Sequence, residues 1–200
     1  GWSSVINYAN RTQGVTAPEV TTYDTIGLTG LSDAQKTQLN QWLQDKTLND
    51  SAKIKSAYQI ITNGQNKNID DYYNIAITPD LRNYDPSIIE AALALSVVPT
   101  DTIADLQTKV DNLDVDGDGV TFINDSDDAD PWTDNDNDTL SDKFESYFAS
   151  LDPLVNNSSA LSTDTDGNGI ADFWENDLAN SAEGRAAWIN QTWKLATDNH

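Results

Sequence analysis

Residues 164–175, with the sequence DTDGNGIADFWE, decide how the C-terminal half of this chain folds. Oxygen-bearing side chains stand at positions 1, 3, 5, 9 and 12 of this twelve-residue stretch, and glycine stands at position 6. The alternate spacing directs the first three side chains at one centre, and the glycine permits the sharp turn there. Six to eight oxygens at about 2.3–2.6 Å are what Ca²⁺ requires, so the stretch predicts a calcium loop. The predicted ligands are Asp164, Asp166, Asn168, the Ile170 carbonyl, Asp172 and Glu175.

A second stretch, residues 134–145 with the sequence DNDNDTLSDKFE, repeats every ligand position. It differs at position 6, where Thr139 stands in place of glycine. If that position needs a positive φ, threonine there costs about 1–2 kcal/mol, and we expect a weaker or distorted site. The predicted ligands are Asp134, Asp136, Asp138, the Leu140 carbonyl, Asp142 and Glu145.

A third stretch, residues 114–125 with the sequence DVDGDGVTFIND, fits at positions 1, 3, 5, 6 and 7 only. Position 9 is Phe122 and position 12 is the shorter Asp125. Carboxylates that follow it could complete this shell or share an ion with the next stretch. The predicted ligands are Asp114, Asp116, Asp118, the Val120 carbonyl, Asp125, Asp127 and Asp130, with Asp128 as a further carboxylate nearby. The three stretches together predict about three Ca²⁺ ions.

The charge balance narrows the possible functions. The formal net charge is -22, and 28 of the 33 acidic residues are aspartate. Residues 111–177 hold 19 of these acids and only one basic residue, Lys143. Such a chain repels nucleic acid and anionic membranes, because phosphate binding needs Lys and Arg. A disordered acidic tail is the alternative, but the large aromatic side chains interleaved with the acids argue against it.

Residues 1–110 show the spacing of short amphipathic helices separated by turns. A capping-box pattern at 32–35 begins one helix, and Asp50 can cap a second that Asn63-Gly64 ends. Another short helix is predicted over about 69–75.

Two more helices are predicted from Asp85-Pro86 and from 100–102, and residues 12–29 are expected to be irregular or a short strand pair. The apolar positions expected in the core include Leu39, Trp42, Leu43, Ile54, Tyr58, Ile61, Tyr72, Tyr73, Ile88, Ala92, Ile103, Leu106 and Val110. A ligand groove lined by Trp42 or by Tyr72 and Tyr73 is the alternative use of these aromatic residues.

The expected fold class is mainly α, with a small helical N-terminal domain followed by irregular calcium-binding loops with short helices. The expected domains are 1–110, 111–180 and a C-terminal helix within 181–200 that packs on the rest. In that helix Ser181 is the expected cap and Ala186, Ala187, Ile189, Trp193 and Leu195 the buried stripe, with a Trp188/Trp193 sugar platform as the alternative. Short helices are also expected at 141–151 and 171–179. The longest apolar stretch, 88–98, is too short to span a bilayer, so no membrane insertion is expected.

At the three loops the chain resembles the thrombospondin type 3 repeat in its cysteine-free bacterial form. The resemblance rests on the three aspartate stretches and on Asp-Pro at 130–131 and 152–153. It implies calcium ligation at the matching positions, an extracellular setting and an ion-filled core with little regular structure. Residues 23–31, YDTIGLTGL, with a degraded second copy from Asp71, also resemble short helical repeats of very large secreted proteins of Gram-negative bacteria.

A paired EF-hand is the nearest competing interpretation, because two of the loops match its ligand positions. It needs a helix entering each loop, and the residues before Asp134 and Asp164 do not form an amphipathic pattern. A calcium sensor typically exposes a Met-rich groove, and this chain has no Met. The first loop also resembles a dockerin loop, but the spacing does not fit a dockerin's paired repeat.

No catalytic residues are predicted. The chain has no Cys, and its single His is His200, so thiol catalysis and Ser–His or Cys–His pairs are excluded. The sequence favours a non-catalytic, calcium-stabilised module of an extracellular or surface protein, in a Gram-negative bacterium, that acts in adhesion or as a spacer. The chain begins at Gly1-Trp2, which suggests a mature form or an excised fragment. Two alternatives stay open: recognition of a peptide, glycan or other surface protein by a groove in 1–110, and a fragment of a secreted glycosidase.

Overall fold

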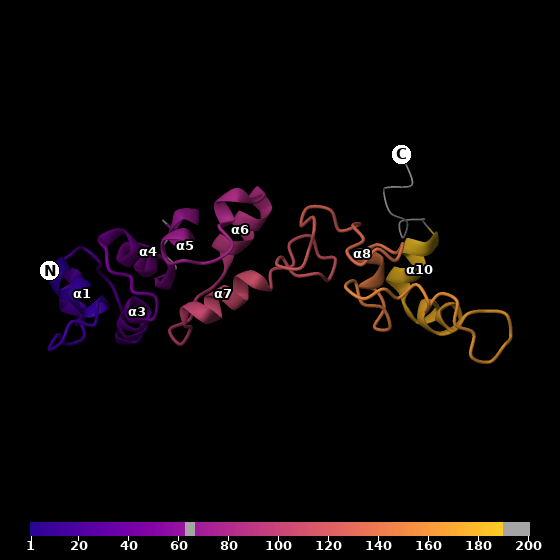
Figure 1. Cartoon of the computed structure of the whole chain (residues 1–200), viewed down its shortest axis with the longest axis horizontal. Helices are drawn as coiled ribbons and strands as arrows, with labels where there is room; N and C mark the ends of the chain where they lie inside the picture. The colour runs from indigo at the N-terminus through magenta and orange to yellow at the C-terminus, as the bar shows by residue number, and fades with distance from the viewer. Residues whose placement is uncertain (63–66, 190–200) are drawn as a thin grey trace. The chain divides into compact units, whose positions relative to one another are not determined.

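The computed structural model describes residues 1–62 and 67–189, and it confirms a mainly α fold (Figure 1). The chain divides into two compact units, residues 1–111 and residues 112–200. Within the described ranges the only β pairing is an isolated bridge between Asp152 and Val155. No helix in these ranges is both long enough and apolar enough to cross a bilayer.

The first unit is a set of short helices in which α4 lies beside both α3 and α5 (Figure 1). Side chains begin these helices as the sequence predicts. Ser32 forms a capping box with Gln35, and Asp50 accepts hydrogen bonds from the amides of Ala52 and Lys53. The helices are α1 (Trp2–Ala9), α2 (Val20–Asp24), α3 (Asp33–Asp45), α4 (Ser51–Ile61), α5 (Ile69–Asn74), η1 (Leu81–Asn83), α6 (Pro86–Ala94) and α7 (Ile103–Asp111).

The first unit is built from two similar halves. Helices α2 and α5 end in the same way: the Leu28 amide donates to the Tyr23 carbonyl at 3.0 Å, and the Ile77 amide donates to the Tyr72 carbonyl at 3.0 Å. Gly27 and Ala76, which precede these amides, both have positive φ. The buried positions of the two halves recur 49 residues apart, as Tyr23 and Tyr72, Leu28 and Ile77, Leu39 and Ile88, Leu48 and Val97, Ile54 and Ile103, Ala57 and Leu106, and Ile61 and Val110.

The sequence-based expectation for residues 12–29 is wrong over its second half, where helix α2 forms. Its buried Tyr23 explains the helix, because the phenol donates to the Asn40 side chain at 2.6 Å and anchors α2 on α3. Trp42 and Tyr72 are buried core residues, whereas Tyr73 is 49 % exposed and not a core residue. The expected helix stop at 63–64 lies outside the described residues.

The second unit contains more loop than helix. Its elements are α8 (Asp142–Glu145), the π-helical turn η2 (Phe173–Asp177), α9 (Leu178–Asn180) and α10 (Ala182–Ile189). An apolar cluster holds them together, with Phe144 and Phe148 rings 5.1 Å apart and Phe148 and Phe173 rings 4.9 Å apart. Leu140, Leu151 and Ala187 complete the buried part of this cluster.

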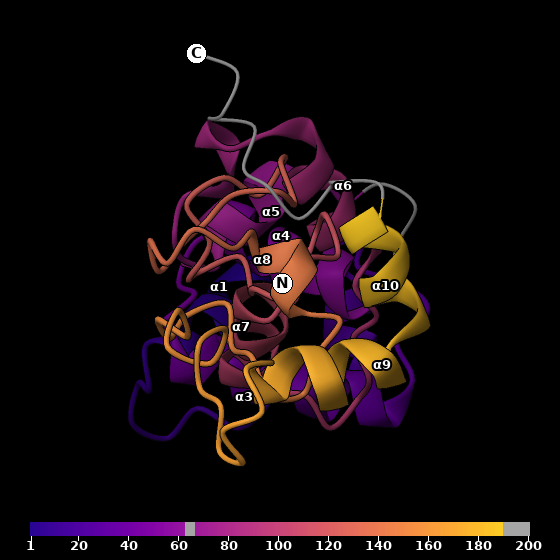
Figure 2. The same cartoon turned by 90° about the vertical axis from the view of Figure 1, so that its right-hand side faces the viewer.

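The short helices of the second unit differ from the expected ones. The helix expected over 141–151 ends at Glu145, because the Phe148 amide bonds back to Glu145, three residues earlier, at 2.8 Å. In α10 the Ser181 hydroxyl caps the Gly184 amide as expected, but Ala186 is exposed and Gly184 is buried against the Phe148 ring. Figure 2 shows α10 leading away from the helical turns that include α9. The side chains of 188 and 189, and all of residues 190–200, which include Trp193 and Leu195, lie outside the described residues.

Candidate metal centre

The three aspartate stretches, which we call loop one (114–125), loop two (134–145) and loop three (164–175), share one backbone conformation. In each loop the carboxylate at position 1 accepts a hydrogen bond from the amide at position 6: Gly119 to Asp114 at 3.2 Å, Thr139 to Asp134 at 2.9 Å and Gly169 to Asp164 at 2.8 Å. In each loop the side chain at position 5 accepts from the amide at position 7, at 2.7 Å, 2.9 Å and 2.8 Å. These bonds fold each loop around the oxygens at positions 1, 3 and 5.

Two residues of each loop adopt the left-handed backbone conformation. Position 6 does so at Gly119, Thr139 and Gly169, with φ of 95°, 82° and 90°. Position 4 does so as well, at Gly117, Asn137 and Gly167. Position 6 therefore does need a positive φ, and at Thr139 this conformation strains a threonine backbone. The positive φ at position 4 was not predicted from the sequence, although Gly and Asn, which stand at this position, are the residues that tolerate a positive φ best.

The carboxylates of loops one and two form groups that could hold metal ions. Asp114, Asp116 and Asp118 bring one oxygen each to within 4.8 Å of the others, and Asp134, Asp136 and Asp138 do the same. Oxygens on a shell of radius about 2.3–2.6 Å lie at most about 5 Å apart, so both groups fit one Ca²⁺-sized ion each. Among the residues described, none of these carboxylates forms an ion pair with Lys or Arg.

Glu145, at position 12 of loop two, lies near the carboxylates of Asp138 and Asp136. Its side chain is fully buried, and its Oε2 has no hydrogen-bond partner among the described residues. The pKa of Glu145 is raised to about 9, mainly by burial and in smaller part by the nearby carboxylates of Asp138 and Asp136. A buried carboxylate with a free oxygen beside three other carboxylates is expensive unless a cation neutralises it.

Asp118 is the buried carboxylate of loop one that corresponds to Glu145 in loop two. It is fully buried, and its Oδ2 has no partner in the described part of the chain. Burial raises the pKa of Asp118 to about 7, with the carboxylates of Asp116 and Asp125 adding to the rise. Asp116 also has a buried, unpartnered Oδ2. The donor set is made of hard oxygens, which suits Ca²⁺, Mg²⁺ or Mn²⁺ better than softer metals.

Asp142, the predicted position-9 ligand of loop two, does not belong to the acidic group of Asp134, Asp136 and Asp138. One of its oxygens groups with Asp118 and Asp125 and not with the other acids of loop two. It is fully buried and accepts a hydrogen bond from the Asn135 amide at 3.0 Å. Asp172 in loop three makes the equivalent bond to the Thr165 amide at 3.0 Å. The position-9 carboxylates therefore hold the amide at position 2, which the spacing did not predict.

Of the acids that follow loop one, Asp128 interacts electrostatically with two carboxylates of that loop, Asp125 and Asp116. Burial raises the pKa of Asp128 to about 6, and the carboxylates of Asp125 and Asp116 contribute. Asp127 and Asp130 instead accept hydrogen bonds from the amides two residues on, as in ordinary turns, and belong to none of the acidic groups. Asp128 also belongs to none of the acidic groups in the described residues, so none of the three acids is placed at a metal centre by the geometry.

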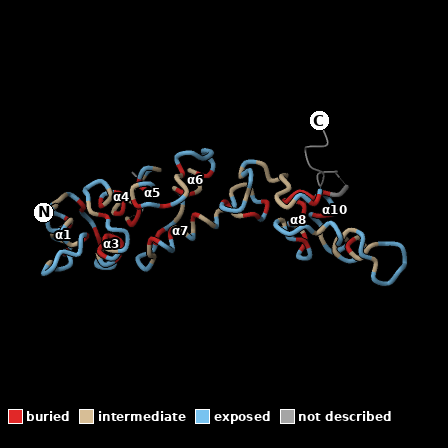
Figure 3. The backbone as a smooth tube through the Cα atoms, viewed as in Figure 1, coloured by how far each residue is buried: buried red, intermediate tan, exposed pale blue. Residues whose placement is uncertain are grey.

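Loop three keeps the conformation but is the most exposed of the three. Ile170, at position 7, is 51 % exposed, whereas Val120 and Leu140 at the same position are 2 % and 1 % exposed. Figure 3 shows buried residues around α8, and the residues from 152 to 172 are mostly exposed. The Asn168 amide group lies between Asp166 and Glu175, at 3.1 Å and 2.7 Å. With only two Asp among its first three ligands, loop three forms no group of three acids within the described residues.

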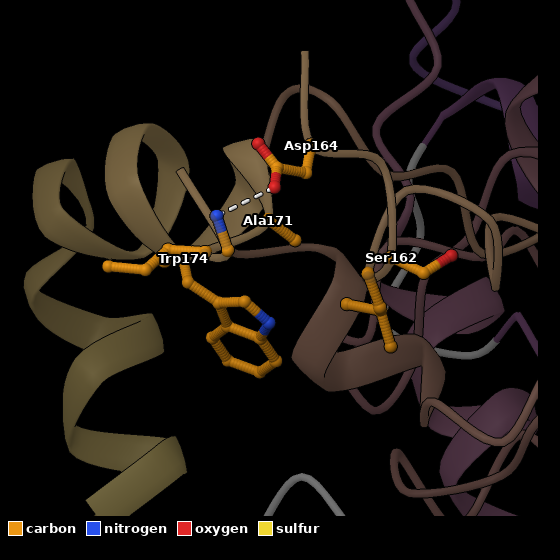
Figure 4. A pocket seen from close by; sticks show the side chains of 7 residues that line it. Ser162, Asp164, Ala171 and Trp174 are labelled. Carbon is orange, nitrogen blue, oxygen red and sulfur yellow. Dashed lines mark hydrogen bonds between the residues drawn. The ribbon is translucent and has the colours of Figure 1, made fainter. Parts of the chain in front are cut away.

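An open pocket of about 420 Å³ lies beside loop three, and Figure 4 shows it. The Trp174 indole and Ser162 line it from two sides, and the dashed bond there reaches the Asp164 carboxylate. Asp164 is the single carboxylate that lines this pocket.

Two asparagines that the spacing did not single out complete the centre. Asn135 donates from its side chain to Asp125 at 3.0 Å and accepts from the Ser126 amide at 2.9 Å, joining the end of loop one to loop two. Asn157 donates from its backbone to Asp138 at 2.7 Å and from its side chain to Glu145 at 3.2 Å. Neither residue stands at a ligand position, so no signal in the loop pattern could have found them.

Neither loop two nor loop three has an entering helix in the described chain, which separates both from a paired EF-hand. The geometry therefore defines acidic loops that could bind metal ions, with buried, unpartnered oxygens in two of them. No family model, curated protein or solved structure matches the chain.

Proposed function

We propose that residues 112–180 bind Ca²⁺ and that the ions stabilise this part of the chain. The observation that supports the proposal is the pair of buried carboxylates, Asp118 and Glu145, each with an oxygen that has no partner among the described residues. A divalent ion at each loop supplies the missing partner and neutralises the acids around it. Binding free energy then becomes folding free energy for the loops.

Calcium suits these loops better than magnesium. Ca²⁺ accepts six to eight oxygens in flexible arrangements, whereas Mg²⁺ requires a near-ideal octahedron at shorter distances. Each loop offers side-chain oxygens at positions 1, 3 and 5, and loops two and three add a Glu at position 12 that can supply two oxygens. Three loops of this kind account for about three ions per chain.

The working function that follows is non-catalytic: a calcium-stabilised module of a bacterial extracellular or surface protein, acting in adhesion or as a spacer. The resemblance of the loops to thrombospondin type 3 repeats supports the setting, because such repeats occur in surface proteins and between secreted modules. Millimolar calcium is available outside cells and keeps such loops filled. The concentration of negative charge in the loops supports a stabilising use of the acids rather than a catalytic one.

Calorimetric titration of the calcium-stripped chain tests the proposal. We expect at least two Ca²⁺ ions per chain and weaker binding of Mg²⁺. One ion or none would reject the assignment of the loops. As a control, the Asp164→Ala variant should keep binding at loops one and two but lose the ion of loop three.

One observation favours a second function, recognition of a glycan or peptide by the first unit. An open pocket of about 380 Å³ is lined by Tyr73, Lys53 and Asp80 among other residues, and the guanidinium of Arg82 stacks on the Tyr73 ring at 3.5 Å. A half-exposed aromatic ring beside polar side chains is a common recognition surface. Glycan arrays and peptide pulldowns with the intact chain and its Tyr73→Ala variant would separate the two, because a mere spacer binds nothing.

A further inference from the structure

The place where loop one meets loop two holds a third acidic group, which belongs to neither loop alone. It consists of Asp118 and Asp125 of loop one and Asp142 of loop two, with one oxygen from each within 4.8 Å of the others. Asp118 and Asp142 are fully buried. We call this group the junction.

The two loops meet closely at the junction. A side chain built at Gly119 would lie 3.1 Å from Ser146, and Gly117 approaches the Lys143 ammonium, which donates to its carbonyl. The Lys143 ammonium thus donates to a backbone carbonyl of loop one. Within the described residues it forms no ion pair with the junction carboxylates. Three carboxylates are left together with no cationic side chain among them.

A comparison with loop two shows what is missing at Asp118. Asp138 stands at the same position, and both of its oxygens accept backbone hydrogen bonds, from Leu140 and from Asn157. Asp118 accepts the equivalent bond from Val120, but its Oδ2 accepts none among the described residues. Loop two satisfies the second oxygen with a protein amide, whereas the second oxygen of Asp118 is buried and unpaired among the described residues. One oxygen of Asp118 also lies within 4.8 Å of oxygens from Asp125 and Asp142.

The sequence explains why the junction forms. Position 9 of loop one is Phe122, which is buried and brings no oxygen. The position-9 carboxylate of loop two, Asp142, instead brings one oxygen to within 4.8 Å of Asp118 and Asp125, and hydrogen bonds from Asn135 hold it there. Asn135 also holds Asp125 at 3.0 Å, so one amide side chain orients two of the three acids.

We infer that the junction is a fourth divalent-cation site, formed by Asp118, Asp125 and Asp142, which shares Asp118 with the ion of loop one and couples loops one and two. The inference rests on the proposed function, because it needs an ion in loop one as the neighbour with which Asp118 is shared. Ligands from both loops mean that the junction site is complete only when both loops are folded. Its ion therefore makes binding at loops one and two cooperative and leaves loop three independent.

Counting ions by native mass spectrometry in saturating Ca²⁺ tests the inference. The wild-type chain should carry four ions, and both Asp142→Asn and Asp125→Asn should carry at least one fewer. Asp172→Asn is the matched control, because it changes the equivalent position of loop three and should keep four. Far-UV circular dichroism in Ca²⁺ shows whether each variant is folded. Because Asp125 is only half-buried, we expect its substitution to disturb the fold less than that of Asp142.

The outcomes of this experiment distinguish a failure of the junction site from a failure of the proposed calcium binding by the three loops. Three ions on the wild type and on both junction variants would overturn the fourth site and leave the loop sites standing. No ions on the wild type would overturn the proposed function itself. Loss of one ion from Asp172→Asn as well as from Asp142→Asn would show that position 9 ligates within its own loop, and would also overturn the junction.

Discussion

Thr139 occupies the one position-6 site in the three loops that is not glycine. Its φ is 82°, and its amide must still reach Asp134 at 2.9 Å for loop two to close. Threonine is branched at Cβ and adopts this conformation only under strain. Packing elsewhere compensates for the strain, since Leu140 next to it is buried in the apolar cluster.

Thr139→Gly should raise the free energy of unfolding in saturating Ca²⁺ by about 1 kcal/mol, because the relief of strain exceeds the entropy that glycine adds to the unfolded chain. Urea unfolding followed by fluorescence measures the change. Gly169→Ala is the opposite control: its φ is 90° and nothing lies within 4 Å of the added methyl group, so only the backbone conformation is penalised. Equal stability of Thr139→Gly and the wild type would show that loop two carries no strain at this residue.

Glu145 is the residue at which the ion-free and ion-bound proteins should differ most. Its pKa of about 9 means that folding near neutral pH without calcium requires this carboxyl to take up a proton. Glutamine at 145 removes that requirement, and it also removes the charge that a bound ion needs.

Glu145→Gln should therefore raise the melting temperature in EGTA by a few degrees and lower it in Ca²⁺, a change of sign between the two buffers. Thermal melts by circular dichroism in each buffer provide the measurement. Glu175→Gln, at the same position of exposed loop three, should leave the EGTA melt almost unchanged. A variant of Glu145 that melts lower in both buffers would contradict a cation-binding role for this side chain.

At the scale of elements, the loops were more predictable than the helices that follow them. The spacing of oxygens in 114–125, 134–145 and 164–175 anticipated their common fold, because each hydrogen bond runs over two to five residues and is decided locally. The spacing could not show which loop is buried. Loop three matches the ligand pattern best in sequence, yet Ile170 is exposed and the buried centres lie in loops one and two.

What the sequence missed depends on contacts between distant residues. Asp142 keeps the bond to the Asn135 amide of its own loop, and one of its oxygens also lies within 4.8 Å of Asp118 and Asp125 of loop one. Asn157 reaches loop two from a segment with no pattern of its own. Helix α2 was missed because Tyr23 is held by Asn40, seventeen residues on. The helix caps at Ser32, Asp50 and Asp85 were predicted correctly, since a cap is decided within four residues.

The loop pair also predicts a pH dependence. In the ion-free protein the pKa of Asp118 rises from 3.8 to about 7 and that of Glu145 from 4.5 to about 9. The folded chain then binds more protons than the unfolded chain between these values, so its stability falls as the pH rises through this window.

The melting temperature in EGTA should therefore fall steadily from about pH 5 to about pH 8. In Ca²⁺ the trend should weaken or reverse, because protons compete with the ion for the same oxygens. Melts at several pH values in both buffers provide the measurement. A calcium-free protein that becomes more stable as the pH rises would mean that these carboxylates are not buried without the ion.

At the scale of the whole molecule, the two units should respond differently to calcium. Residues 1–111 form their core from paired helices with apolar side chains. The ion pairs in the described part of this unit are ordinary ones between Lys or Arg and acids. In residues 112–180 the buried groups include Asp118, Asp138, Asp142 and Glu145. The hydrophobic effect suffices for the first unit, whereas the acids of the second repel one another unless a cation neutralises them.

Hydrogen exchange of the intact chain, followed by mass spectrometry in Ca²⁺ and in EGTA, tests this difference most directly. Peptides from 114–145 should be protected in Ca²⁺ and lose most of their protection in EGTA, while peptides from α3, α4 and α6 should exchange alike in both buffers. Equal protection of 114–145 with and without calcium would contradict the claim that cations hold these loops together.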